Sequence, residues 1–269
     1  MSKIFLIDVG KCTGCYNCQL ACKDEHCEND WTPYAAPQPL TGQFWCRVTE
    51  HVQGTIPKVK IHYIARMCAH CEKAKCMAVC RTGAITRRAD GFVLIDPAKC
   101  AGCGECIRAC PYDAIFFNDK LRIAQKCTGC AHLLDHGPAG TVPRCAEACP
   151  TDALVFGEES ELADRLVGAR PLTPGGKIWY KNIPGEFIGG TVYDPVEKEV
   201  VIGARCVLTG EGKTLETLTD SYGDFWFKNL PAGGSYDLTV TAEGFRPKTF
   251  EHISVDTSVN LDDIPLERL

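Results

Sequence analysis

Residues 80–117, which read CRTGAITRRADGFVLIDPAKCAGCGECIRACPYDAIFF, decide the fold of the chain. One cysteine opens this stretch, and four more follow between Cys100 and Cys110. Between Cys80 and Cys100, two short apolar runs flank Asp90 and Gly91, a pair of residues that favours a tight β-hairpin turn. The stretch therefore predicts a cysteine loop, a hairpin, a second cysteine loop and a closing strand.

Cysteine is the outlier of the composition. The chain has 269 residues and 19 cysteines, whereas its hydrophobic fraction of 45% and charged fraction of 23% are ordinary for a globular protein. Sixteen of the cysteines fall into four groups that each end in the spacing C-x3-C, namely Cys12, Cys15, Cys18 and Cys22; Cys68, Cys71, Cys76 and Cys80; Cys100, Cys103, Cys106 and Cys110; and Cys127, Cys130, Cys145 and Cys149.

The spacing indicates metal ligands rather than disulfides. Cysteines that are two residues apart cannot easily bridge each other, whereas a C-x2-C pair converges on one metal. Structural zinc usually takes two such pairs from separate units, but three close cysteines with a distant fourth suit the four corners of a [4Fe-4S] cluster. We therefore expect iron-sulfur clusters, with structural zinc as the alternative.

The groups must be paired before ligands can be assigned, because in two-cluster ferredoxins the fourth cysteine of each run ligates the other cluster. Segment 68–117 reads as one complete ferredoxin repeat, which pairs the second group with the third. The first and fourth groups then form an outer unit around this inserted repeat. The four predicted [4Fe-4S] sites are Cys12, Cys15 and Cys18 with Cys149; Cys127, Cys130 and Cys145 with Cys22; Cys68, Cys71 and Cys76 with Cys110; and Cys100, Cys103 and Cys106 with Cys80.

Each predicted site has four thiolates, so no iron is left open to bind a substrate. This pattern favours electron transport over chemistry on a substrate, and it predicts no catalytic residue in the chain.

Histidines near the cysteine groups are not expected to bind metal. His70 lies between thiols that already complete a set, and a Rieske site would need two histidines. We expect His132 and His136 to cap a helix or to face solvent. The cysteines outside the groups are expected to be free thiols, and they are Cys27, Cys46 and Cys206.

Charge and hydropathy exclude several other classes of protein. The formal net charge is -5, whereas a nucleic-acid partner would call for a concentrated basic surface. No apolar run approaches the roughly 18 residues of a membrane helix. The N-terminal stretch shows no export signal, so we expect a cytoplasmic protein, or one that is exported together with a signal-bearing partner.

The composition changes near Pro184, where the cysteine groups have ended and the chain becomes rich in β-formers. Short alternating runs lie between Gly, Asp, Asn and Pro turns, as in a small antiparallel sandwich. The stretch TDSYGDFWFKNLPAGGSYDLTV resembles carboxypeptidase regulatory-like and Cna-B-like repeats. We therefore expect an α+β domain over 1–183, with the inserted repeat at 68–117, and an all-β immunoglobulin-like sandwich over 184–269. The sandwich would dock to a partner or stabilise the chain.

The four groups, together with CAHLLD in the fourth and the WYKNIP that follows, resemble the iron-sulfur subunits of molybdopterin oxidoreductases of the dimethyl sulfoxide reductase family. IDVGKCTGCYNC, VLIDPAK and AQKCTGCAHLLD extend the similarity to the small subunits of pyrogallol-phloroglucinol transhydroxylases. The resemblance implies a large catalytic partner subunit that holds molybdopterin with molybdenum or tungsten.

One set of cysteines departs from the transhydroxylase pattern, in which the ligands that answer to Cys80, Cys100, Cys103 and Cys106 are lost. Transhydroxylation moves no net electrons, so a complete fourth site favours an oxidoreductase that exchanges electrons with an external carrier, such as an anaerobic hydroxylase of phenolic rings. The alternatives are a transhydroxylase small subunit, a stand-alone polyferredoxin, and a zinc-stapled binding protein.

Overall fold

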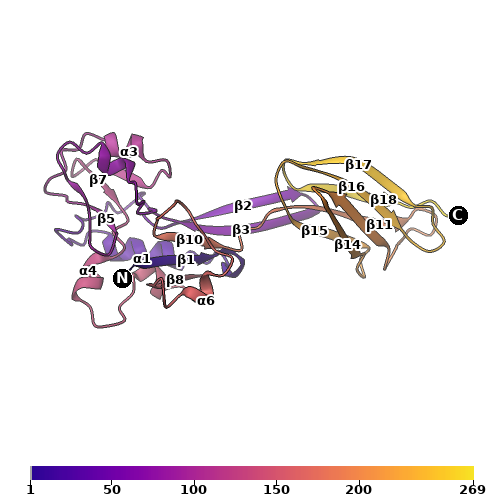
Figure 1. Ribbon diagram of the computed structural model, residues 1–269, viewed down its shortest axis with the longest axis horizontal. Coiled ribbons are helices and arrows are strands. Elements are labelled where there is room, and N and C mark those ends of the chain that lie inside the picture. The colour runs from indigo at the N-terminus through magenta and orange to yellow at the C-terminus, as the bar shows by residue number, and fades with distance from the viewer. Residues whose placement is uncertain (1) are drawn as a thin grey trace. The chain divides into compact units, whose positions relative to one another are not determined.

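The computed structural model of the protein describes residues 2–269 (Figure 1). The chain forms two compact units, one of Met1–Glu50 with His62–Ile183 and the other of His51–Ile61 with Pro184–Leu269. We refer to them as the first and second units. None of the helices in the described part of the chain combines the length and apolar character needed to cross a bilayer.

A four-stranded sheet joins the two ends of the first unit. Its order is β8 (Leu154–Glu158), β1 (Lys3–Asp8), β10 (Ile178–Lys181) and β9 (Arg170–Pro171). The apolar run of β1 is buried, which explains its central place. Strand β8 runs antiparallel to β1, with Ile7 opposite Leu154. This pairing brings together the chain just before the first cysteine group and the chain just after the fourth.

The first unit contains short helices, most of which lie within a cysteine group. Several start from a residue in the left-handed region, such as Gly104 with φ 74°, which lets the chain turn sharply from ligand loop into helix. The helices are α1 (Asn17–His26), α2 (Lys75–Ala78), α3 (Glu105–Ala109), α4 (Ala131–His136), α5 (Arg144–Glu147) and α6 (Ala163–Leu166), with a 3-10 turn at Val9–Lys11.

The inserted repeat has the predicted hairpin and a small core of its own. Strands β4 (Ile85–Arg87) and β5 (Val93–Ile95) pair antiparallel around Asp90 and Gly91. A second hairpin of β6 (Ile115–Asn118) and β7 (Ile123–Lys126) follows the third cysteine group. Side chains of both hairpins, including Ile85, Val93 and Ile115, pack together with cysteines of the second and third groups.

A long hairpin contributes to both units. It consists of β2 (Arg47–Thr55) and β3 (Lys58–Arg66), and its tip, His51–Ile61, belongs to the second unit. There Lys58, although almost fully buried, pairs with the carboxylate of Asp224, and the Lys60 ammonium lies 4.5 Å from the ring centre of Trp226.

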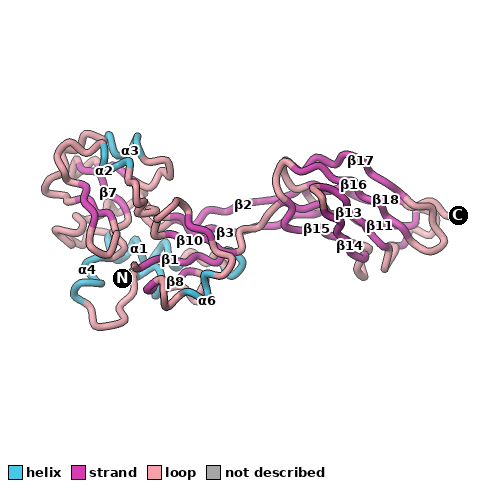
Figure 2. The backbone as a smooth tube through the Cα atoms, in the orientation of Figure 1, coloured by secondary structure: helices cyan, strands magenta, loops and turns pink. Residues whose placement is uncertain are grey.

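The rest of the second unit is all β, as the turn-rich sequence predicts (Figure 2). Strand β11 (Glu186–Asp194) pairs with β12 (Glu199–Val200), β15 (Asp224–Leu230) and β18 (Val259–Pro265). The other sheet has the order β14 (Lys213–Leu218), β13 (Arg205–Gly210), β16 (Gly234–Thr241) and β17 (Lys248–Val255). Alternate residues of β13, β15 and β16 fill one shared core.

Candidate metal centres

The structure brings the sixteen grouped cysteines together in four sets of four thiols. We name each set by its first cysteine, as the Cys12, Cys127, Cys68 and Cys100 sets. All of these thiols are unbridged. Their ligation of clusters and the crossed pairing stay predictions.

The Cys12 set lies where β1 and β8 end. Cys12, Cys15, Cys18 and Cys149 line one pocket. Burial raises the pKa of the Cys12 thiol, and the three other thiols of the set raise it further. Cys15 is exposed, so this set reaches the surface of the first unit.

The Cys127 set is the most deeply buried. All four thiols, Cys127, Cys130, Cys145 and Cys22, are buried. Burial raises the pKa of Cys22 well above its usual range, and the thiols of Cys145, Cys127 and Cys130 add to that effect. Burial likewise raises the pKa of Cys127 to about 12. Four thiols held together away from water are costly as thiolates unless a positive centre compensates for them.

Two cavities in the inserted repeat hold the other sets. Cys68, Cys71, Cys76 and Cys110 line a cavity of about 290 Å³, and Cys80, Cys100, Cys103 and Cys106 line one of about 240 Å³. Burial raises the pKa values of Cys71 and Cys106 to about 11. Cys103 is exposed, so the Cys100 set also reaches the surface.

Each set has a peptide N–H group that points at one of its sulfurs. The amides of Gly129, His70, Ala124 and Leu154 lie 3.3–3.4 Å from the sulfurs of Cys127, Cys68, Cys100 and Cys149. Cys80 and Cys149 each have a threonine hydroxyl two residues later, at 3.7 and 3.8 Å. Such donors stabilise thiolate ligands and help to set the potential of an iron-sulfur cluster.

The donor sets fit [4Fe-4S] clusters better than single ions. A cubane takes one thiolate at each of four corners and fills a cavity, whereas a zinc ion sits within about 2.3 Å of its sulfurs. Within residues 2–269, no three His, Cys, Asp or Glu side chains converge on a single-ion site. The cavities in the inserted repeat are instead large and lined by four thiols each.

The four sets follow one another in a row. Cys46, a buried thiol outside the groups, contacts both Cys18 of the Cys12 set and Cys145 of the Cys127 set. Cys127 in turn lies near Cys68, and Cys106 of the Cys100 set lies near Cys76 of the Cys68 set. The order is therefore Cys12, Cys127, Cys68 and Cys100 sets, with the exposed cysteines Cys15 and Cys103 in the two outer sets.

Two histidines differ from what the sequence suggests. His132 was expected to cap a helix or face solvent, but it is buried, stacks on Trp31 at 4.3 Å between ring centres, and bonds Glu25 through Nε2 at 2.9 Å. The expectation was wrong for His132 because helix α4 turns this side inward, and only His136 is exposed. His26 was not singled out by the sequence, yet its Nε2 lies 3.8 Å from the sulfur of Cys130.

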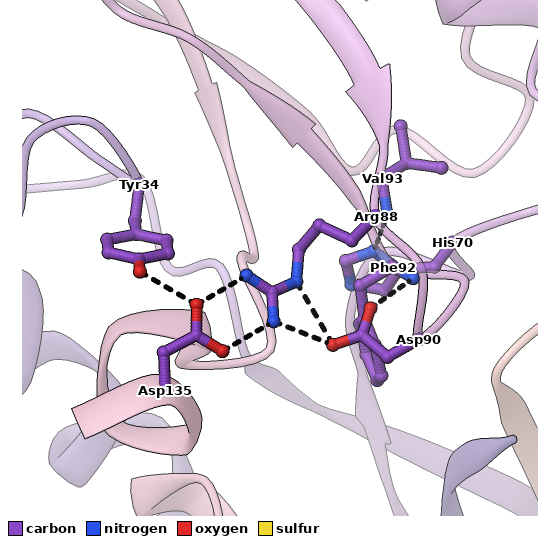
Figure 3. A network of polar contacts seen from close by, with 7 residues as sticks. All are labelled: Tyr34, His70, Arg88, Asp90, Phe92, Val93 and Asp135. Atoms are coloured by element: carbon purple, nitrogen blue, oxygen red, sulfur yellow. Dashed lines mark hydrogen bonds and ion pairs between the residues drawn. The ribbon is translucent and has the colours of Figure 1, made fainter. Parts of the chain in front are cut away.

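A polar network ties the inserted repeat to helix α4 (Figure 3). Arg88 donates to both oxygens of Asp135, at 2.8 and 2.7 Å, and to one oxygen of Asp90 at 2.9 and 3.0 Å. The Tyr34 hydroxyl donates to Asp135 at 2.7 Å, and the Phe92 amide donates to Asp90 at 3.1 Å. Helix α4 begins directly after Cys130, so this network holds the Cys127 set against the hairpin of the repeat.

Both parts of the chain match known protein families. A 4Fe-4S dicluster domain matches residues 59–159, and a carboxypeptidase regulatory-like domain matches residues 188–267. The pyrogallol hydroxytransferase small subunit of Pelobacter acidigallici is 34% identical over 97% of this chain and 98% of its own.

Other relatives match the cysteine-rich part alone. The iron-sulfur subunit of the arsenate respiratory reductase of Shewanella sp. is 41% identical over 42% of this chain and 44% of its own. One subunit of the anaerobic dimethyl sulfoxide reductase of Escherichia coli is 38% identical over 47% of this chain and 60% of its own. By its cysteine pattern, its dicluster domain and its full-length match, the chain belongs to the family of iron-sulfur subunits of molybdopterin oxidoreductases that includes the pyrogallol hydroxytransferase small subunit.

Proposed function

We propose that the chain is the electron-transfer subunit of a molybdopterin-containing complex and that it carries four [4Fe-4S] clusters, one at each set of thiols. The observation that supports this most strongly is the row of four complete sets. A [4Fe-4S] cluster takes up and releases single electrons when it is bound, and four thiolates per set leave no open coordination position for a substrate.

The order of the sets suggests a path across the first unit. The Cys127 and Cys68 sets lie inside the row, and each outer set has one exposed thiol, Cys15 or Cys103. An electron could thus enter near one of these cysteines and leave near the other. We propose that the molybdopterin subunit docks at one end and an external electron carrier at the other.

A complete Cys100 set favours a complex with net electron flow. The transhydroxylase pattern lacks the ligands that answer to this set, and a transhydroxylase needs no outlet for electrons. We therefore favour net oxidation or reduction by the partner subunit, such as anaerobic hydroxylation of a phenolic ring with water as the source of oxygen. The full-length match to the pyrogallol hydroxytransferase small subunit supports the aromatic substrate class, and it also keeps a transhydroxylase as the second candidate.

The second unit is proposed to act in assembly rather than in electron transfer. Its only cysteine, Cys206, is fully buried in the sandwich core. We place the protein in the cytoplasm because its free thiols, among them Cys46 and Cys206, suit a reducing compartment.

Anaerobic purification from the native host tests the proposal. We expect a large subunit with molybdenum or tungsten to co-purify, and about sixteen irons and sixteen sulfides per chain. About twelve irons would favour the transhydroxylase, and sixteen without a large subunit would favour a stand-alone polyferredoxin. Zinc without sulfide would refute the proposal.

A further inference from the structure

One face of helix α1 serves two of the proposed clusters. Cys18, Cys22 and His26 are spaced by four residues and are the buried residues of this helix. Cys18 belongs to the Cys12 set and Cys22 to the Cys127 set. The third residue on the face, His26, ends the helix directly beside the Cys127 set.

His26 contacts a thiol of that set from inside the protein. Its Nε2 lies 3.8 Å from the sulfur of Cys130, within the range of a hydrogen bond to sulfur, and the residue is only 1% exposed. The other ring nitrogen, Nδ1, is buried and has no partner among residues 2–269.

The unpartnered nitrogen identifies the tautomer. If the proton were on Nδ1, a buried N–H would lack an acceptor and the Nε2 lone pair would face a thiolate, which are both unfavourable. With the proton on Nε2, the ring donates to the Cys130 sulfur and leaves only an acceptor unsatisfied. A neutral ring with Nε2–H is therefore the form that fits.

Aromatic rings hold this imidazole in place and keep water away from it. The Trp45 ring lies 4.7 Å from the His26 ring, centre to centre, and the His132 ring lies 5.3 Å away nearly at right angles. His132 is fixed in turn by its bond to Glu25. The Nε2–H group of His26 is therefore held in place and shielded from water. Under these conditions a hydrogen bond to a charged acceptor is strongest.

We infer that His26 donates a hydrogen bond to Cys130 and thereby raises the reduction potential of the cluster at the Cys127 set. The inference rests on the proposed function, because it requires Cys130 to be a cluster ligand. Reduction adds negative charge to the cluster and its thiolates, so an N–H donor stabilises the reduced form more than the oxidised form. His26 is not a ligand and acts only through the Cys130 sulfur.

The test compares variants of His26 in the purified complex by EPR-monitored redox titration. His26→Phe keeps a ring against Trp45 but removes the donor, and we expect the potential of one cluster to fall while the other potentials stay. The ratio of reduced to oxidised cluster at a fixed potential should drop about fivefold, which corresponds to about 40 mV at 59 mV per tenfold change. The affected signal is identified as the one that Cys130→Ser changes.

Further variants separate the hydrogen bond from packing. His26→Gln keeps an N–H donor and should restore much of the potential, whereas His26→Met, which has none, should behave like His26→Phe. His132→Phe is the matched control, because it alters the same buried ring cluster while leaving the contact of His26 with Cys130. If the His26→Phe variant fails to bind one cluster, the hydrogen bond is tested instead by comparing the cluster potentials of His26→Gln and His26→Met.

The outcomes distinguish the inference from the proposed function. Equal potentials in the wild type, His26→Met and His26→Gln, with all four clusters present, would refute the role of His26 alone. Fewer than four clusters in the wild-type complex would instead refute the proposed function.

Discussion

Replacing Arg88 with methionine is expected to loosen the attachment of the inserted repeat to helix α4. The guanidinium lies between two carboxylates, those of Asp90 and Asp135, and donates two hydrogen bonds to each (Figure 3). Methionine keeps most of the aliphatic stem but removes the charge and all four hydrogen bonds. Two carboxylates would then face the same space without a cation between them.

The expected loss of stability follows from the partial burial of this network. Arg88 holds the pKa of Asp135 below its usual value, at about 2 instead of 3.8. At 1.36 kcal/mol per pKa unit, this difference amounts to about 2 kcal/mol, part of which comes from the Tyr34 hydroxyl. The Asp135 side chain is 34% exposed, so solvent screening reduces the figure to about 1 kcal/mol. The bonds to the less exposed Asp90 bring the total to about 2 kcal/mol.

The assay follows the release of the clusters, because cofactor-containing proteins rarely unfold in a reversible two-state manner. After an anaerobic jump into guanidinium chloride, the visible absorbance of the clusters should decay up to about 30-fold faster in Arg88→Met, the rate equivalent of about 2 kcal/mol. Arg108→Met is the matched control, since Arg108 forms only an exposed pair with Glu105 and should change the rate by less than about threefold.

A rate for Arg88→Met no greater than that for Arg108→Met would show that the network does not hold the repeat. A double-mutant cycle with Asp135→Asn offers a second check. We expect strong coupling between the two substitutions, and simple additivity would contradict the argument.

Other predictions concern the Cys100 set and the second unit. Cys103→Ser should lower the iron content by about four per chain, while Cys206→Ser should leave it unchanged; equal iron in both would overturn the assignment of ligands. Burial raises the pKa of Cys206 to about 12, so iodoacetamide at neutral pH should label it only after unfolding, as peptide mapping can show. Because the folded pKa lies above the unfolded value, the contribution of Cys206 to stability is complete below pH 8.5 or so and is lost as the pH rises toward 12. Lys58→Met leaves Asp224 without its buried cation and should increase hydrogen exchange in residues 51–61. The control Lys213→Met alters an exposed strand and should have a smaller effect. Equal exchange in both variants would argue that the pair of Lys58 and Asp224 does not fix the tip of the β2–β3 hairpin.

The sequence was enough to predict the elements that depend on local spacing. The hairpin through Asp90 and Gly91 follows from two apolar runs with a turn between them, and β4 and β5 form it. The β strands after Pro184 likewise follow from alternation and turn residues, as β13, β15 and β16 show. These features depend on neighbours in the chain, so a single sequence can reveal them.

Contacts between distant segments needed the tertiary structure. Nothing near Thr55 in the sequence indicates that residues 51–61 belong with the strands after Pro184, because the two segments lie more than a hundred residues apart in the chain. His132 read as a surface residue on a short helix, but the packing of Trp31 from a loop about a hundred residues earlier buries it.

By itself the sequence was enough to identify the iron-sulfur character of the cysteine-rich part and the all-β character of the C-terminal part, because thiol spacing and residue alternation are local. Only the tertiary structure decided the order of the four sets and the contact of His26 with Cys130, since both join segments far apart in the chain. These contacts depend on how buried surfaces pack against one another in three dimensions. Local patterns in a single sequence do not show that packing.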